Sequence, residues 1–380
     1  MTGLRIQNLT LSHFRSYEHY KLPEMGNLVV FIGHNGVGKT NILEGIQLLT
    51  ACESFRHPQI AQLIREGQET AILTMACGDG NRSLETRLVL EPGKKRYTVN
   101  GKAKAISDVK GVLPAVSFIP DDLDLAKKSS SVKRRALDEL GSQISKNYYV
   151  IYRDYEKTLR YKNRLLKDGA SRMYVESTND TLTLCGTQLF CYRTALFNRM
   201  LPLIEEYYGK ISQSGEVFSA TYLPSWERVG QRRGEAVECG TVADWANREK
   251  LSISELMRES LDQMLDEELD RKRSLIGPHN DQITFEVDRR DASQFASQGQ
   301  QRSIVLAWKL AEVEMVRQTL GTTPVLLLDD VMSELDEQRR SMLVGFMTED
   351  IQTFITATDL SSFDKSLLDR ATVVEIGQQL

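Results

Sequence analysis

The chain has 380 residues, of which 41% are hydrophobic and 26% charged, and its formal net charge is −4. This length and composition can bury a large core and favour two lobes over one. No apolar run is long enough to span a membrane and the N-terminal segment lacks the apolar stretch of a secretory signal, so we expect a cytoplasmic protein. A protein that coats nucleic acid with its whole surface would be basic, so DNA binding here would need a local patch or a switch.

The first third of the chain is predicted to form strands and one helix. Alternating or short apolar runs predict strands over 4–14, 27–33, 84–92 and 95–102, and helical spacing predicts a helix over 41–50. Asn100-Gly101 is the signal of a two-residue hairpin turn.

The middle of the chain changes to long, charged, helical segments with few glycines, for example 131–169 and 253–273. Strands return afterwards, at 281–288, 323–330, 353–359 and 371–377. We therefore expect one α/β domain made from residues 1–118 and 273–380, with a helical insertion over 119–272.

Cysteine usage fits a reducing compartment. The five cysteines form no C-x-x-C pair and are scattered at Cys52, Cys77, Cys185, Cys191 and Cys239. Buried, reduced thiols therefore fit this sequence better than a disulfide framework or a zinc site.

The segment GHNGVGKT, residues 33–40, matches the phosphate-loop pattern G-x-x-x-x-G-K-[ST] between a predicted strand and a predicted helix. Its glycines let backbone N–H groups turn toward phosphate, its lysine suits the β- and γ-phosphates, and its threonine hydroxyl suits Mg²⁺. The alternative is a glycine-rich turn that only links strand and helix. The predicted nucleotide-binding residues are Gly33, His34, Asn35, Gly36, Val37, Gly38, Lys39, Thr40 and Asn41.

Two carboxylates follow the aliphatic strand at 323–330, where ligands bind at the carboxyl edge of a parallel sheet. Asp329, with Thr40, is predicted to bind Mg²⁺. Asp330, with Lys39, is predicted to act in hydrolysis by orienting or deprotonating the attacking water. The alternative for this Asp pair is that it caps the next helix.

The segment SQGQQRS, residues 297–303, precedes an apolar helical run and has more polar groups than an N-cap needs. In chain order, the phosphate loop, this segment, and LLLDDVMSELD at 326–336 resemble the motifs of ABC-type ATPases. Within that superfamily the chain resembles the RecF family, which is related to SMC and Rad50 heads. The resembling blocks are 14–17, 33–46, 99–102, 118–125, 134–145, 277–282, 297–312 and 326–336.

The resemblance implies an α/β ABC-type ATPase head (lobe I, mixed sheets with helices) with an inserted helical arm (lobe II). It implies a homodimer in which two subunits enclose two ATP molecules with Mg²⁺, head to tail, and separate after hydrolysis. On that model the signature of one subunit contacts the ATP of the other, and Asp336 of the D-loop packs on the opposing phosphate loop. The signature residues are Ser297, Gln298, Gly299 and Gln300. Helix capping by Ser297 is compatible with this role.

The resemblance also implies a weak, DNA-stimulated ATPase that binds single-stranded and duplex DNA at gaps and junctions. RecR and RecO are the implied partners, in recombinational repair, replication-gap processing and the SOS response, and no membrane is involved. Asp330 stands where ABC transporters carry Glu, which predicts slow hydrolysis. No histidine follows the signature, and Thr356, Thr358 or Asp359 stands in the region of the transporter switch histidine.

Three other functions fit these features less well. An ATPase subunit of a transporter would carry the switch histidine, an SMC-like tether would need extended heptads, and a metabolic P-loop kinase would have no use for the signature segment.

One predicted helix has a basic face formed by Arg153, Lys157, Arg160, Arg164 and Lys167, with spacings of three and four residues. Tyr148, Ile151, Tyr155, Leu159 and Leu166 are predicted to face a core on the other side. A second basic cluster contains Lys127, Lys128, Lys133, Arg134 and Arg135. Contact with DNA phosphates and an ordinary solvated helix face are both consistent with these patterns, and a DNA contact of this kind would be independent of sequence and sensitive to salt.

Overall fold

Residues 3–22, 25–80, 82–212, 215–232, 241–347, 350–361 and 363–377 are described by the structure, a computed structural model. The chain divides into two units, Met1–Asp122 with Trp308–Leu380, and Leu123–Ala307. Cys52, Cys77, Cys185 and Cys191 are free thiols, and Cys239 lies outside the described residues. No helix in the described part of the chain combines the length and apolarity needed to cross a membrane.

The first unit contains two sheets. A six-stranded antiparallel sheet has the order β2-β1-β4-β5-β6-β7, and a five-stranded parallel sheet has the order β14-β3-β13-β12-β8. The strands are β1 (Arg5–Phe14), β2 (Tyr17–Leu22), β3 (Leu28–Ile32), β4 (Ala71–Gly78), β5 (Ser83–Glu91), β6 (Lys94–Val99), β7 (Lys102–Lys104), β8 (Ala115–Phe118), β12 (Val325–Asp329), β13 (Thr353–Ala357) and β14 (Thr372–Glu375). The predicted hairpin turn is confirmed, because Asn100 and Gly101 have φ of 48° and 74° between β6 and β7.

Helix α1 (Lys39–Thr50) contacts both sheets of this unit. Its side chains Ile42, Ile46 and Leu49 belong to one core with residues of both sheets. The helix approaches β1 closely at Gly45, where an added Cβ would lie 2.9 Å from a methyl group of Leu11. The other helices of this unit are α2 (Ile60–Leu63), α3 (Ile106–Val109), α14 (Val331–Glu334), α15 (Glu337–Phe346), α16 (Lys365–Leu368) and the C-terminal part of α13 (Gln298–Leu320).

The parallel sheet brings three distant segments to one edge. Asp329 at the end of β12 is in register with Thr356 of β13, and Thr356 is in register with Phe31 of β3. The residues of β12 and β13 are all buried, as expected for strands covered on both faces. The phosphate loop therefore leaves the sheet beside the ends of β12 and β13.

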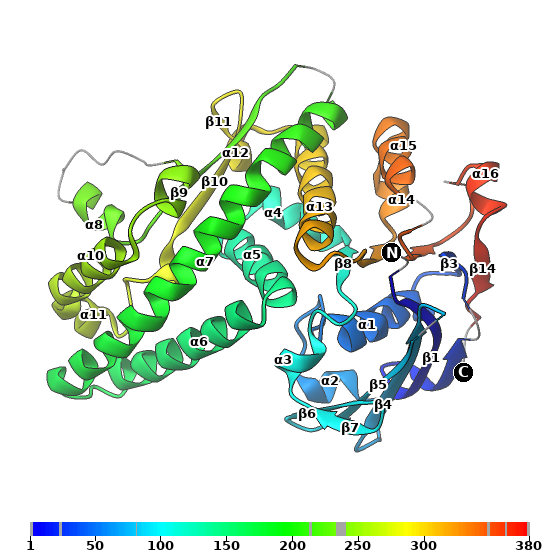
Figure 1. Cartoon of the computed structure of the whole chain (residues 1–380), viewed down its shortest axis with the longest axis horizontal. Helices are drawn as coiled ribbons and strands as arrows, with labels where there is room; N and C mark the ends of the chain where they lie inside the picture. The colour runs from blue at the N-terminus through cyan, green and yellow to red at the C-terminus, as the bar shows by residue number, and fades with distance from the viewer. Residues whose placement is uncertain are drawn as a thin grey trace. The chain divides into compact units, whose positions relative to one another are not determined.

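The second unit is mainly helical around a three-stranded sheet of order β11-β10-β9. The 41-residue helix α7 packs against α6 and α10 (Figure 1). The elements of this unit are α4 (Asp124–Lys127), α5 (Ser130–Ile144), α6 (Lys146–Lys167), α7 (Arg172–Ser212), β9 (Phe218–Leu223), α8 (Glu227–Arg232), α9 (Val242–Ala246), α10 (Lys250–Gln263), α11 (Leu265–Arg271), β10 (Gln282–Val287), β11 (Arg290–Asp291), α12 (Ala292–Phe295) and the start of α13. Short 3₁₀ turns lie at Pro120–Leu123 and Pro278–Asn280.

Sequence-based expectations differ from the structure at the domain boundaries and in the long helical segments. The insertion begins at Leu123 and not at residue 119, and the segment at 253–273 contains parts of two helices, α10 and α11. The chain re-enters the first unit at Trp308 and not at residue 273, because β10 pairs with β9 of the insertion along its whole length. The long helical segment at 131–169 is two helices, because Ser145 takes an extended conformation between α5 and α6 and its side chain caps the second helix.

Candidate nucleotide-binding site

The phosphate loop joins β3 to α1 through two glycines in the left-handed region. Gly36 has φ of 86° and Gly38 has φ of 108°. A Cβ at Gly38 would lie 2.8 Å from the Tyr17 hydroxyl and 3.0 Å from Ser16 Oγ, so both the backbone conformation and the space require glycine. Together these constraints explain why the sequence places glycine here.

Lys39 turns back over this loop. Its Nζ donates to the carbonyl oxygens of Gly33 at 2.5 Å and His34 at 3.0 Å. Burial lowers the pKa of Lys39, whereas the carboxylates of Asp330 and Asp329 act in the opposite direction. The ammonium is therefore held as a local positive charge beside two carboxylates, which suits it to bind terminal phosphates.

Asp329 joins the phosphate loop to the sheet. Its Oδ1 accepts a hydrogen bond from Thr40 Oγ1 at 2.8 Å and another from Thr356 Oγ1 at 2.7 Å. Thr356 Oγ1 in turn accepts from the backbone N–H of Asp330 at 3.0 Å. Hydroxyl and carboxylate oxygens this close form the hard donor set that Mg²⁺ prefers, so Thr40 and Asp329 fit the ion.

Asp330 occupies the N-cap position of α14 but its side chain does not cap that helix. Its backbone lies in the left-handed region with φ of 54°, which is uncommon for a residue with a side chain. Burial raises the pKa of Asp330, Asp329 adds to this effect, and a hydrogen bond from Ser333 opposes it. A carboxylate with a raised pKa is better suited to accept a proton from water.

These groups line one pocket of about 170 Å³. Its lining residues are Asn35, Gly36, Gly38, Lys39, Thr40, Asn41, Arg56, Asp329, Asp330 and Thr356. Of the other predicted loop residues, Gly33 and His34 contribute the carbonyls that bind Lys39, and Val37 does not line the pocket.

Sequence reasoning missed Arg56 altogether and left Thr356 as one of three candidates. Arg56 donates to Asn41 Oδ1 at 2.9 Å and lies 3.5 Å from the buried carboxylate of Glu44. No sequence motif predicts Arg56 as a pocket residue, because it reaches the pocket from the loop after α1. Thr356 is the member of its trio that lines the pocket, whereas Thr358 and Asp359 are exposed.

The predicted signature starts α13 with a reciprocal cap. Ser297 Oγ accepts from the Gln300 N–H at 3.2 Å, and the Ser297 N–H donates to Gln300 Oε1 at 2.7 Å. Gln300 also donates to Glu216 at 2.9 Å, so both ends of its amide are engaged within its own unit. Ser297 and Gln298 are exposed, and Gly299 is half-buried. The D-loop residue Asp336 is exposed and caps α15.

The predicted DNA-binding residues fall into two groups in the structure. Arg153, Lys157, Arg160, Arg164 and Lys167 are all exposed on α6. Their helix turns Tyr148, Tyr155, Leu159 and Leu166 into the core, with Ile151 half-buried.

The second basic cluster requires a correction. Lys133 is buried, its Nζ donates to the Ile283 carbonyl at 3.2 Å, and it lies 4.5 Å from the centre of the Phe285 ring. Burial lowers the pKa of Lys133 to about 8. Arg134 donates to the Asp281 carbonyl and is half-buried, and only Arg135 of these three is exposed. Lys133 therefore packs in the core and is not part of a basic surface.

Comparison with known proteins places this geometry in a family. A family model described as the RecF/RecN/SMC N terminal domain matches residues 5–378. The chain is 34% identical over 381 residues to the DNA replication and repair protein RecF of Halalkalibacterium halodurans, covering 99% of this chain and 98% of that one. Identity to RecF of Thermosynechococcus vestitus is 32% over 377 residues, covering 98% and 95% of the two chains. The chain belongs to the RecF family.

Solved structures agree with the RecF assignment. A structure of the recombination mediator protein RecF with ATPrS, from the RecFOR pathway, matches with a TM-score of 0.84 and 27% identity, covering 95% of this chain and 94% of that one. An Smc head domain from Pyrococcus furiosus matches with a TM-score of 0.51 at 15% identity and shows the fold alone. The expected ABC-type ATPase fold and RecF-family role in DNA replication and repair are confirmed, in preference to a transporter subunit or a structural tether.

Proposed function

We propose that this chain is an ATP-dependent DNA-binding protein of recombinational repair, which closes as a homodimer around two ATP molecules and opens after hydrolysis. The observation that carries this proposal is the pocket in which Lys39, Thr40 and the Asp329–Asp330 pair converge. Bound Mg²⁺ would supply positive charge at the β- and γ-phosphates, and Thr40 with Asp329 would hold it.

The phosphate loop, Thr356 and Asp330 have distinct parts in the proposed cycle. The loop N–H groups and Lys39 bind the phosphates. Thr356 orients Asp329 and fixes the backbone of Asp330 through its single hydroxyl. Asp330 orients the attacking water and accepts its proton. Because an Asp side chain is shorter than Glu, we propose a slow ATPase, and its stimulation by DNA belongs to the same proposal.

The exposed polar groups at the start of α13 support the dimer. A reciprocal cap uses the groups of Ser297 and Gln300, yet the exposed Gln298 side chain goes beyond what capping requires. In the proposed dimer this segment contacts the γ-phosphate bound by the other subunit. The α6 face of each subunit then binds DNA phosphates, with RecO and RecR as partners, in the cytoplasm.

The first experiment tests dimerisation. We expect a non-hydrolysable ATP analogue to shift the full-length protein from monomer to dimer in sedimentation velocity. Ser297→Arg should abolish the shift, because a bulky cation replaces a small hydroxyl at the proposed contact. The variant should still bind one analogue per chain, measured by titration calorimetry, and Lys39→Ala provides the control that loses binding itself. A sedimentation coefficient that does not respond to nucleotide in the native protein would contradict the model.

A further inference from the structure

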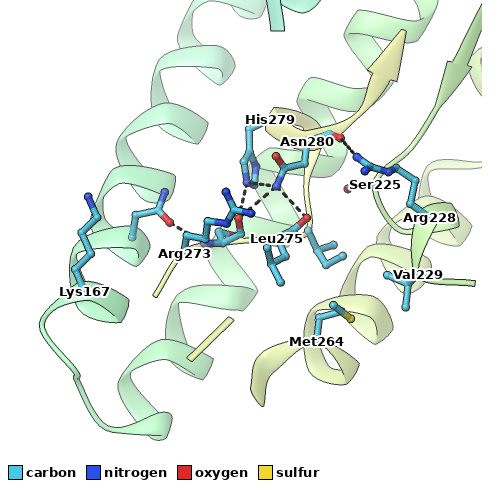
Figure 2. Close-up of a pocket in the computed structure, with 12 residues that line it drawn as sticks. Lys167, Ser225, Arg228, Val229, Met264, Arg273, Leu275, His279 and Asn280 are labelled. Carbon is cyan, nitrogen blue, oxygen red and sulfur yellow. Dashed lines mark hydrogen bonds between the residues drawn. The ribbon is translucent and has the colours of Figure 1, made fainter. Parts of the chain in front are cut away.

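A second pocket, of about 470 Å³, lies in the Leu123–Ala307 unit beside the loop that joins α11 to β10. The loop residues Ser274, His279 and Asn280 line it together with the end of α6 and the start of α8 (Figure 2). This pocket has no role in the proposed ATP cycle.

Three cations from different elements line this pocket. Lys167 is the last residue of α6, Arg228 belongs to α8, and Arg273 comes shortly after α11 (Figure 2). Among the residues that the structure describes, those lining the pocket include no Asp or Glu. Within the described part of the chain, Lys167 and Arg273 have no ion-pair partner, and Arg228 donates only to the Asn280 carbonyl, at 3.3 Å. Positive charges around a pocket favour an anion as its ligand.

A buried carboxylate, Glu268, binds the lining residues Ser274 and Leu275 through hydrogen bonds. Glu268 Oε1 accepts from the Leu275 N–H at 2.7 Å and from Ser274 Oγ at 3.1 Å. Its other oxygen lies 2.5 Å from Nζ of Lys162, and both side chains are fully buried. Asn163 Oδ1 accepts from the Ser274 N–H at 2.7 Å. The charge of Glu268 is therefore used inside the unit and does not neutralise the three lining cations.

The loop is fixed further along by neutral groups. Gly277 has φ of 135° and donates to Ser225 Oγ at 2.8 Å. His279 accepts from or donates to the Tyr155 hydroxyl at 2.5 Å through Nδ1, and its Nε2 lies 3.3 Å from the Ser274 carbonyl. A backbone loop with this many internal partners presents its lining groups in a fixed geometry, as a binding site requires.

We propose that this pocket binds the phosphate group of a nucleotide unit, either within a DNA strand or free. Arginine pairs with phosphate through two parallel hydrogen bonds, and lysine binds phosphate as a point charge. The volume exceeds the 170 Å³ of the phosphate-loop pocket and leaves room for more than the phosphate itself.

The position of Lys167 favours a DNA strand as the source. Lys167 ends the row of exposed cations that begins at Arg153, and it also lines the pocket. At about 1.5 Å per residue that row extends roughly 21 Å along α6. A strand that follows the row would place one phosphate in the pocket. This source rests on the proposed DNA binding, whereas a free nucleotide does not.

The test uses a double variant and a matched control in the full-length protein. Lys167→Gln with Arg273→Gln removes two lining charges. Lys250→Gln with Arg258→Gln removes one lysine and one arginine from exposed positions of the same unit that do not line the pocket. Both proteins are saturated with a non-hydrolysable ATP analogue. A labelled single-stranded oligonucleotide is then titrated by fluorescence anisotropy across a salt series, and binding of dAMP and inorganic phosphate is measured by equilibrium dialysis.

We expect the pocket variant to bind the oligonucleotide about tenfold more weakly, since charged hydrogen bonds are lost. Its salt slope should fall by about 0.7 for each contact removed, while the control changes little. Thermal unfolding should match the native protein, because both substituted side chains are exposed, and Arg273→Lys should restore part of the affinity.

Each remaining outcome is decisive. Unchanged oligonucleotide binding with loss of dAMP or phosphate binding in the pocket variant supports the pocket and assigns it to free nucleotide. Equal behaviour of the two double variants in both assays overturns the proposal. If the native protein binds no DNA at all, the proposed function fails and the dialysis result still decides the pocket.

Discussion

Charged residues of the phosphate-loop pocket and buried charged residues of the helical unit have different surroundings. In the pocket, Lys39 and the two aspartates line a cavity, with the Lys39 ammonium bonded to two carbonyls and Asp329 bonded to two hydroxyls. In the helical unit, Arg193 is buried with two hydrogen bonds to Asp138, at 2.9 and 3.0 Å. Charge in the first region is available to a ligand, whereas the buried charges of the second hold helices to one another and to a sheet.

The role of a basic residue in the insertion therefore depends on its burial and its hydrogen-bond partners, which the sequence does not show. Arg160 and Lys133 look alike in the sequence as members of basic clusters. Arg160 is exposed, whereas Lys133 is buried against Phe285 and the Ile283 carbonyl. Substitutions can distinguish charged residues that bind a ligand from charged residues that stabilise the fold.

The largest expected effect comes from the buried charge of Arg193. Arg193→Met would leave Asp138, and Asp281 at 3.8 Å, buried without their counter-charge. We expect a loss of about 3–5 kcal/mol in the free energy of unfolding, measured by urea denaturation. Arg172→Met removes exposed ion pairs with Glu176 and Asp266 and should cost far less, because exposed pairs are screened by water and salt. Similar losses in the two variants would contradict the distinction between buried and exposed charge.

The next effect concerns the pocket itself. Asp330→Asn keeps the size of the side chain but removes the proposed proton acceptor. We expect steady-state ATP hydrolysis to fall about 100-fold while the ATP-bound dimer persists for longer. Phosphate release and sedimentation in the presence of ATP measure the two quantities. Hydrolysis at the native rate would remove Asp330 from the catalytic role, and unfolding at the native temperature shows that the fold is retained.

Much of the first unit could be predicted from its sequence, because local patterns there coincide with the final contacts. The phosphate loop lies between a strand and a helix, and Asn100-Gly101 forms the turn between β6 and β7. The position at which the chain returns from the insertion to the first unit could not be predicted. Strand β10 pairs with β9, about 60 residues earlier in the chain, and pairing between distant strands leaves no local signal in the sequence.

The candidate site follows the same division. The phosphate loop and the Asp329–Asp330 pair carry motifs, and these motifs predict the pocket residues that lie within them. Arg56 has no motif and enters the pocket through its bonds to Asn41 and Glu44. The amphipathic period of α6 identified its exposed face correctly, but the run of cations around Lys133 has no period that distinguishes a buried lysine from an exposed one.

A smaller effect is expected in DNA binding, where the exposed cations of α6 should contribute and the buried Lys133 should not. Arg160→Glu with Arg164→Glu should weaken DNA binding about tenfold and reduce its salt dependence, because two exposed phosphate contacts are replaced by repulsion. Lys133→Met should leave the salt slope unchanged, since its ammonium already donates within the fold. Anisotropy titrations at several salt concentrations measure both. If charge reversal on α6 leaves the affinity intact, that face is only a solvated surface.

The smallest expected effect is a pH dependence of stability from His279. Burial lowers the pKa of His279 to about 3, and the positive charges of Arg134, Lys162 and Arg193 act in the same direction. The unfolded chain binds a proton near pH 6.5 and the folded chain does not, so this contribution is complete above that pH and is lost as the pH falls toward 3.

At pH 6 the loss should be at most about 0.8 kcal/mol. His279→Gln removes the titrating ring, so the difference in unfolding free energy between pH 8 and pH 6 should shrink by this amount relative to the native protein. The other titrating groups are present in both proteins and cancel in the comparison. An unchanged difference would mean that His279 titrates alike in the folded and unfolded chains, and that the buried cations around it do not disfavour another positive charge.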